Sequence, residues 1–340
     1  MPIRQQSGRV GMIMRSRVPS LQGKQVDAFT FGRAATGKIA HMYTSIFFPR
    51  AVIAAVVLLT TASVGAVQSA LLPAWVCAHP DAIFVGGFDA DGMAIAQDAS
   101  SGSGGSYPGN ATRTIISNGT NRAFYLYVPS TYSPNHPLPL LLVLHGQSGS
   151  PATAPAAAKQ VRSDWSGWAD NNGFIVLAPV ATGSSGSWNP PVDIPIMSDE
   201  LDDTYARYNI DRNRIYLWGF SAGAHLAHAL ALNNTDYFAG YGVSAGGLTQ
   251  YACSDNGSFS PSCAQLLGGV TRIIPVDIHL GDSDPLYTTY GSDNDPALFE
   301  AYGWLLNQTL FYTVFNGSHT YTVLQLGEIW DHLCPHAITP

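Results

Sequence analysis

From residue 112 onward, short apolar runs alternate with longer amphipathic ones. Residues 138–144 are continuously apolar, as expected of a buried strand, whereas residues 122–129 alternate in the manner of a half-exposed strand. Further strands are predicted at residues 174–179, 215–218, 238–244, 273–280 and 310–315, and helices at 155–171, 194–208, 296–307 and 323–333. Strands that alternate with helices predict an α/β fold with a mostly parallel sheet covered on both faces.

The most informative stretch runs from Arg214 to Leu230. It joins a short apolar strand, the pentapeptide Gly-Phe-Ser-Ala-Gly and an Ala-rich helical run. That order is typical of a nucleophile elbow, in which a serine occupies a sharp strand-to-helix turn and glycines avoid clashes with the neighbouring backbone. Ser221 is therefore the predicted nucleophile. The helix that begins at Ala222 would direct its first N–H groups at the reacting carbonyl.

The same Gly-x-Ser-x-Gly pattern occurs a second time, around Ser244. It also follows an apolar run, but it continues into Gly247-Leu248-Thr249-Gln250, which has no helical periodicity. We therefore expect Ser244 to occupy a turn at the end of a strand.

A serine nucleophile needs a base and an acid, which follow it in the α/β-hydrolase order. Asp284 lies just after a predicted strand, where such sheets place their chemistry. It is preferred over Asp282 because the Asp284-Pro285 step fixes a turn. Either residue could instead be an ordinary turn aspartate.

The predicted base is His319, which follows the strand at 310–315. It would accept the proton of Ser221 and later give it to the leaving alkoxide, while the aspartate orients the ring. His332 and His336 also follow the acid, but they lie in or after the last helix, where capping or solvent contact is expected.

The loop after the strand at 138–144 supplies the remaining part of the predicted site. The backbone N–H groups of Gln147 and Ala222 would bind the oxyanion. Trp188 lies in a Gly/Ser-rich loop, where it could line the substrate pocket or pack under its own loop. His225 and His228 are three residues apart without the glutamate of a zinc-protease motif, so packed histidines are expected, with no metal and no other cofactor.

Charge divides the chain into two parts. Residues 1–50 hold eight of the sixteen Lys and Arg residues, whereas the remainder holds eight against 22 Asp and Glu. An acidic surface repels phosphate backbones, so nucleic acid is not an expected partner.

Residues 51–70 have the pattern of a secretory signal. A basic flank precedes an apolar core, and Val64-Gly65-Ala66 offers a small-residue cleavage site. The alternative is an uncleaved membrane anchor, which would be the chain's contact with a membrane. The long basic region suggests the hypothesis that translation starts at Met42.

Cysteine usage and sequons agree with export. The four cysteines, Cys77, Cys253, Cys263 and Cys334, allow three pairings, of which Cys253–Cys263 with Cys77–Cys334 is one. In a eukaryotic source the chain would be a glycoprotein, since six Asn-x-Ser/Thr sequons begin at Asn110, Asn118, Asn233, Asn256, Asn307 and Asn316.

Several segments occur in an order and spacing that identify a family. They are residues 122–149, 168–179, 188–189 and 208–223, Asp284, and Gly317-Ser318-His319-Thr320. Together they resemble the secreted polyhydroxybutyrate depolymerase and feruloyl esterase-like branch of the α/β-hydrolases, which also includes acetylxylan esterases. The resemblance spans about residues 112–335 and implies an α/β-hydrolase fold without a large lid domain.

By that resemblance, Ser221, Asp284 and His319 match the family's triad, and Gln147 follows its His-Gly pair. The chain departs from the family at two positions. Ala224-His225 stands where a second glycine is common, and Tyr321 stands where tryptophan is common. Both changes touch the edge of the pocket, and Tyr321 is expected to contact the substrate.

The sequence thus predicts a secreted serine esterase that forms an acyl-enzyme and hydrolyses it with water. Expected substrates are feruloyl or acetyl esters on polysaccharides, or hydroxyalkanoate polyesters, so the ester can be polymeric. The alternatives are a serine peptidase on the same fold and a non-catalytic binding protein on a hydrolase scaffold. The predicted regions are a basic segment (1–50), a signal peptide or anchor (51–70), a poorly defined segment with a Gly/Ser linker (71–111) and the catalytic domain (112–340).

Overall fold

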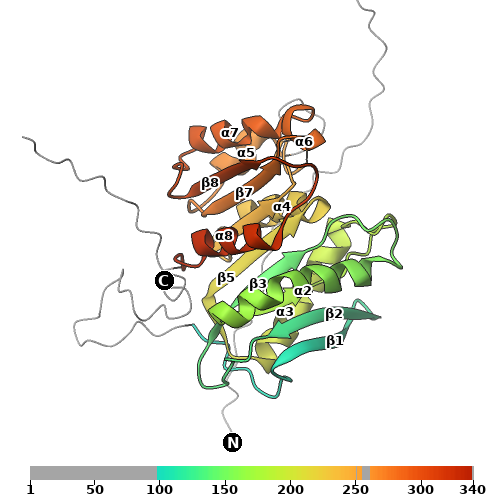
Figure 1. Cartoon of the computed structure of the whole chain (residues 1–340). Coiled ribbons are helices and arrows are strands. Elements are labelled where there is room, and N and C mark those ends of the chain that lie inside the picture. Colours follow the sequence, from blue (N-terminus) through green and yellow to red (C-terminus); the bar gives the residue numbers. More distant parts are fainter. Residues whose placement is uncertain (1–97, 250, 255–260, 339–340) are drawn as a thin grey trace, which may run out of the picture. The chain divides into compact units, whose positions relative to one another are not determined.

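The computed structural model of the protein describes residues 98–249, 251–254 and 261–338 (Figure 1). The predicted basic segment, the signal peptide or anchor and Cys77 lie outside these residues. The described part contains a single eight-stranded sheet. Its strands are β1 (Gly109–Ser117), β2 (Thr120–Val128), β3 (Leu138–Leu144), β4 (Ile175–Ala178), β5 (Ile210–Phe220), β6 (Gly240–Ser244), β7 (Val276–Gly281) and β8 (Leu310–Phe315).

The strand order is β1-β2-β4-β3-β5-β6-β7-β8. Every neighbouring pair from β4 to β8 is parallel, whereas β1 and β2 add an antiparallel edge. The predicted mostly parallel sheet is confirmed. β5 lies in the middle, between β3 and β6, so the carboxyl end of the central strand is where ligands of such sheets bind.

Helices cover both faces of the sheet, as predicted. Among the described residues they are α2 (Ala154–Asn172), α3 (Pro190–Arg207), α4 (Ala222–Asn233), α5 (Cys263–Gly268), α6 (Pro285–Thr288), a short 3₁₀ helix η2 (Ser292–Asn294), α7 (Asp295–Ala301) and α8 (Val323–Leu333). On one face, α2 and α8 lie side by side and bury Trp165 and Trp330 (Figure 1). On the other, α3, α4 and α7 bury Leu201, Leu230 and Phe299.

Two expectations about element bounds are corrected. The helix predicted at 296–307 ends at Ala301, because Gly303 takes a left-handed backbone (φ 100°) that stops the helix. The Gly/Ser stretch predicted as a linker packs on the end of α3 and the start of β5, since Ser100 N–H donates to the Ile210 carbonyl and Gly105 N–H to that of Arg207. Gly102 permits this contact, because a Cβ there would lie 2.1 Å from the Tyr205 carbonyl oxygen.

One disulfide joins described residues, between Cys253 and Cys263. The sequence had left this pairing open among three. Of the helices in the described ranges, none is long and apolar enough to cross a membrane.

Candidate active site

Ser221 occupies the turn between β5 and α4, where the sequence predicts a nucleophile elbow. Its backbone is left-handed (φ 53°, ψ −119°), a conformation that a non-glycine residue adopts only when the surroundings enforce it. The flanking glycines make the turn possible. A Cβ on Gly219 would lie 2.3 Å from the Gly223 carbonyl oxygen, and one on Gly223 would lie 2.2 Å from that of Leu144.

His319 joins this serine to a buried carboxylate. Its Nε2 lies 2.7 Å from Ser221 Oγ, and its Nδ1 lies 2.8 Å from Asp284 Oδ2. An ionised carboxylate only accepts hydrogen bonds, so Nδ1–H donates to Asp284 and Nε2 is left to accept the proton of Ser221. The Asp284 side chain is fully buried, whereas 39% of the His319 side chain is exposed. The arrangement can therefore activate a hydroxyl that a solvent-borne ligand can reach.

The structure distinguishes Asp284 from Asp282, the alternative acid. The second oxygen of Asp284 accepts from Leu286 N–H at 2.9 Å and caps α6, which fixes the carboxylate. Asp282 is exposed instead, and its carboxylate accepts from Gly317 N–H at 3.2 Å. Asp282 thus orders the turn before His319 without contacting the imidazole.

The loop after β3 lies against the elbow. A Cβ on Gly146 would be 3.2 Å from Ser221 Cβ, so the next residue, Gln147, lies close to the serine. Within the described ranges, the backbone N–H groups of Gln147 and Ala222 donate to no protein group. These are the two donors that the sequence predicts for an oxyanion, and both remain available to a ligand.

His145 and Trp188 hold that loop in place. The buried imidazole of His145 accepts from Ala181 N–H at 3.2 Å, so its other nitrogen donates to the Gly146 carbonyl. Burial lowers the pKa of His145, which keeps the ring neutral for this role. The indole N–H of Trp188 donates to the His145 carbonyl at 2.8 Å. Trp188 is half-buried and positions the loop through this bond.

Tyr321 is linked to His319 through the ring of Phe220. Its ring packs edge-on against Phe220 and Trp218, and Phe220 in turn lies 5.4 Å from the imidazole of His319. The Tyr321 hydroxyl donates to Asp164 on α2. Burial and this bond raise the pKa of Tyr321, so the phenol stays protonated. Its hydroxyl is engaged by protein, and the ring supports the serine–histidine pair.

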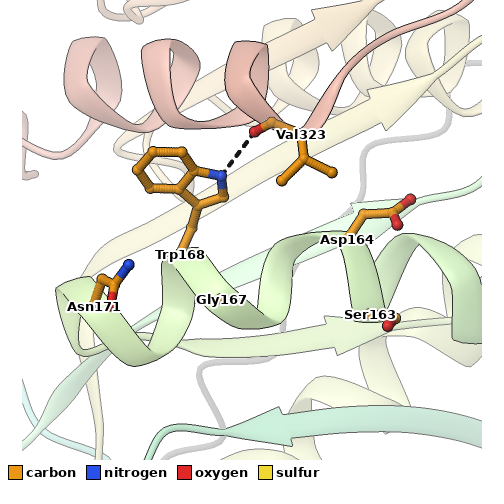
Figure 2. Close-up of a pocket in the computed structure, with 6 residues that line it drawn as sticks. All are labelled: Ser163, Asp164, Gly167, Trp168, Asn171 and Val323. Atoms are coloured by element: carbon orange, nitrogen blue, oxygen red, sulfur yellow. Dashed lines mark hydrogen bonds between the residues drawn. The ribbon is translucent and has the colours of Figure 1, made fainter.

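A shallow pocket of about 340 Å³ lies between α2 and α8 (Figure 2). Asp164, Trp168 and Val323 line it, and the Trp168 indole N–H donates to the Val323 carbonyl at 2.8 Å. None of Ser221, Asp284 and His319 belongs to it. The pocket therefore adjoins Tyr321, whose hydroxyl donates to Asp164, and it is separate from the three proposed reacting residues.

Sequence reasoning missed a second histidine–carboxylate cluster. Asp277 on β7 is fully buried, with His332 Nδ1 at 2.6 Å and His279 Nε2 at 3.0 Å. His332 also stacks on Phe311, so it is not the capping residue that the sequence suggested. Burial alone would raise the pKa of Asp277, but the hydrogen bond from His332 and the nearby His279 ring lower it overall. A carboxylate inside a strand, two residues before a histidine, was the signal in the sequence.

His225 and His228 are both engaged by protein groups. His225 lies 3.1 Å from the Gly247 backbone, and His228 Nδ1 lies 3.1 Å from the Tyr241 hydroxyl. Burial lowers the pKa of His225 to about 4 and that of His228 to about 3. Across the described residues, no three His, Cys, Asp or Glu side chains converge as metal ligands.

Comparisons with known proteins point to esterases. Residues 201–249 match the family model described as BD-FAE. The chain is 34% identical over 116 residues to the bifunctional acetylxylan esterase/xylanase XynS20E of Neocallimastix patriciarum, which covers 33% of this chain and 16% of that protein. It is 32% identical to poly(3-hydroxyalkanoate) depolymerase C of Paucimonas lemoignei, over 43% of this chain and 37% of that protein. It is 30% identical to feruloyl esterase B of Thermothelomyces thermophilus, over 44% of this chain and 53% of that protein.

The chain thus spans about half or less of the length of these curated relatives. Among solved structures, it is similar to the feruloyl esterase module of Clostridium thermocellum, with a TM-score of 0.50 at 15% identity, over 71% of this chain and 92% of that one. This likeness concerns the fold, and it confirms the fold class that the sequence predicts.

Proposed function

We propose that this α/β-hydrolase, a homologue of polyhydroxybutyrate depolymerases and of feruloyl and acetylxylan esterases, is a serine carboxylic-ester hydrolase. The observation that carries the proposal is the continuous hydrogen-bonded path from Asp284 through His319 to Ser221. Two free backbone donors beside the serine complete what acyl transfer requires.

In the proposed reaction, Ser221 Oγ attacks the ester carbonyl while His319 Nε2 removes its proton. The carbonyl oxygen becomes an oxyanion, which accepts from the N–H groups of Gln147 and Ala222. The C–O bond to the alcohol then breaks, and His319 returns the proton to the leaving alkoxide. Asp284 keeps the imidazole in the correct tautomer and stabilises its protonated form. Water, deprotonated by His319, then attacks the acyl carbon. The bond from that carbon to Ser221 Oγ breaks, His319 returns the proton to Ser221 Oγ, and the acid is released.

The proposed substrates are feruloyl or acetyl esters of polysaccharides, or hydroxyalkanoate esters, because these are the ester classes named by the relatives. We further propose that the protein is secreted, on the basis of the signal-like pattern of residues 51–70. A peptidase on this fold, or a binding protein, would need no change of scaffold. No contact in the described residues favours either one.

The test is ester hydrolysis by the wild type and by Ser221→Ala, using p-nitrophenyl acetate, methyl ferulate, acetylated xylan and hydroxybutyrate oligomers. We expect acid release from at least one ester and a loss of about 10⁴-fold or more in kcat for the variant, because the nucleophile is gone. Circular dichroism of both proteins controls for folding. Equal activity of the two proteins would assign the reaction to another residue, and an inert but folded wild type would favour the binding-protein alternative.

A further inference from the structure

Two exposed tyrosines lie beside the candidate active site and have no role in the reaction described above. Tyr251 and Tyr290 keep 40% and 41% of their surface exposed, and their ring centroids are 6.5 Å apart, nearly edge to face. Large aromatic side chains are costly to leave in water in adjacent positions, and such patches commonly mark binding sites.

Tyr251 is connected to the nucleophile through His225. The two rings are stacked at 3.7 Å with an angle of 7° between their planes. His225 lies one helical turn after Ser221, since its backbone N–H donates to the Ser221 carbonyl at 3.1 Å. Tyr251 therefore packs on the first turn of α4, directly after Ser221.

Tyr290 is connected to the acid through α6. Asp284 caps that short helix, and Tyr290 N–H donates to the Pro285 carbonyl just beyond its end. Gly247 lies close to both Ser292 and Tyr251, because a Cβ on Gly247 would be 2.3 Å from Ser292 Oγ and 3.6 Å from the Tyr251 ring. The two tyrosines thus flank the site from the α4 side and from the α6 side.

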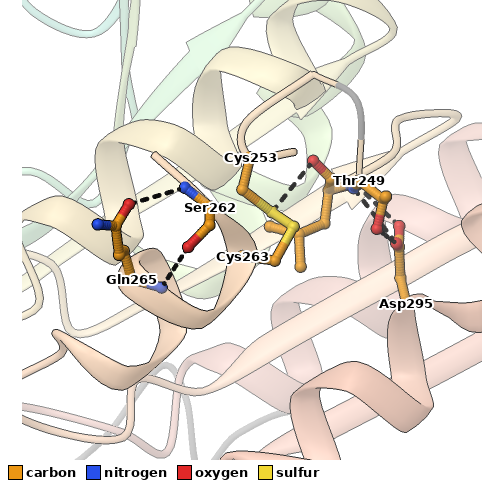
Figure 3. Close-up of a disulfide and its surroundings, with 7 residues drawn as sticks. Thr249, Cys253, Ser262, Cys263, Gln265 and Asp295 are labelled. Carbon is orange, nitrogen blue, oxygen red and sulfur yellow. Dashed lines mark hydrogen bonds between the residues drawn. A yellow bond between two sulfur atoms is a disulfide. The ribbon is translucent and has the colours of Figure 1, made fainter. Parts of the chain in front are cut away.

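The described residues before and after Tyr251 are tied to other parts of the fold (Figure 3). The buried carboxylate of Asp295 accepts from Leu248 N–H and from the Thr249 hydroxyl, both at 2.8 Å. On the other side of the tyrosine, Cys253 is bonded to Cys263. A tyrosine ring has few rotatable bonds, so it loses little conformational entropy when a ligand stacks on it.

We propose that Tyr251 and Tyr290 form a ring-binding subsite for the ester substrate. Its ligand is one ring with an apolar face, attached close to the scissile bond. That ring is either an arene or a pyranose, because the apolar face of each stacks on an aromatic side chain. This inference rests on the proposed function and deepens it. It predicts that ring-bearing esters are better substrates than small aliphatic ones.

The experiment measures kcat/KM of the full-length protein and of Tyr251→Ala on four esters. Methyl ferulate carries an arene in the acyl group, p-nitrophenyl acetate carries one in the alcohol, acetylated xylan carries a pyranose in the alcohol, and methyl butyrate has no ring. We expect the ratio of kcat/KM on one of the ring esters to that on methyl butyrate to fall about tenfold in Tyr251→Ala. Which ester shows the fall identifies the ring. Tyr251→Phe, which keeps the ring, is expected to lose less of this ratio.

The matched control is Tyr107→Ala, which removes another exposed tyrosine, one that packs on Tyr132 near the β1 end of the sheet. Its ratio should equal that of the wild type. An unchanged ratio for Tyr251→Ala on all three ring esters would overturn the subsite, even if Ser221→Ala is inactive as proposed. If the wild type hydrolyses no ester, the proposed function fails by itself. The subsite is then judged by calorimetric binding of ferulate and xylotriose, and it is overturned if Tyr251→Ala binds both as the wild type does.

Discussion

The two Gly-x-Ser-x-Gly pentapeptides lie side by side at the carboxyl ends of β5 and β6. They differ in which residue makes the turn. In the first, Ser221 itself has the left-handed backbone (φ 53°) and lies at the apex, facing His319. In the second, Ser244 is still in the strand, and the next residue, Ala245, has the left-handed backbone (φ 51°). A shift of one residue sends Ser244 into the interior, where it is fully buried.

The pentapeptide alone therefore specifies only a tight turn. We expect a nucleophile only where the turn is centred on the serine and a helix follows it. The second turn supports the first, because the Ser244 carbonyl accepts from Ser221 N–H at 3.0 Å. Gly246 also lets it approach α4, since a Cβ there would lie 2.2 Å from Ala224 Cβ.

Replacing a glycine of each pentapeptide by alanine is expected to give the largest difference in stability between the two turns. Gly223→Ala would place a Cβ 2.2 Å from the Leu144 carbonyl oxygen, which is backbone and cannot move alone. We expect a loss of about 3 kcal/mol or more in unfolding free energy and a loss of ester hydrolysis, because the loop of Gln147 must shift. A Cβ in Gly242→Ala would lie 2.5 Å from the Cγ2 methyl of Ile329, a side-chain atom, and the change should cost about 1–2 kcal/mol. Urea denaturation measures both; equal losses would contradict the difference in packing.

The elbow and its partners could be predicted because local sequence encodes them. The strand, glycines and helix around Ser221 are contiguous, and Asp284 and His319 each follow a strand with a clear apolar pattern. Parallel strands bring their carboxyl ends to one edge, so the order of the elements implied the contact that the structure contains.

The remaining features depend on contacts between distant segments. Tyr251 lies in a stretch without periodicity, and only its stacking on His225 brings it to the site. The bond between Asp277 and His332 joins a strand to the last helix, and the amphipathic pattern of that helix does not specify a partner for its histidine. Both contacts are set by tertiary packing, which a local pattern does not encode.

Acid should change the stability contributed by the two turns' surroundings in opposite directions. On α4, burial lowers the pKa of His225 to about 4 and of His228 to about 3, so the unfolded chain binds more protons below about pH 6.5. Their contribution to stability is therefore lost as the pH falls from 6.5 toward 4, by a few kcal/mol in order of magnitude. Leu248 and Thr249, which follow the second turn, donate to Asp295 at the start of α7. Burial raises the pKa of Asp295 to about 6, so its contribution to stability is present at pH 4 and lost as the pH rises through 6.

Chemical denaturation at pH 7, 6, 5 and 4 measures this balance. His228→Leu should make the fall in stability toward pH 4 shallower than in the wild type, because it removes one buried histidine. Asp295→Asn should make it steeper, because it removes the carboxyl that opposes the histidines. Identical slopes for all three proteins would mean that neither segment controls the acid response.

The smallest effect is expected from Ser244→Ala. This change removes the oxygen that accepts from the Trp218 indole N–H at 3.2 Å and leaves that buried donor without its partner. The expected cost is about 1 kcal/mol of unfolding free energy. The Ser244 carbonyl that accepts from Ser221 N–H is backbone and remains, so kcat/KM should stay within about twofold of the wild type. Steady-state kinetics beside Ser221→Ala decides between the two serines. A variant at position 244 that stays folded but loses hydrolysis would mean that a turn centred on the serine is not what makes the nucleophile.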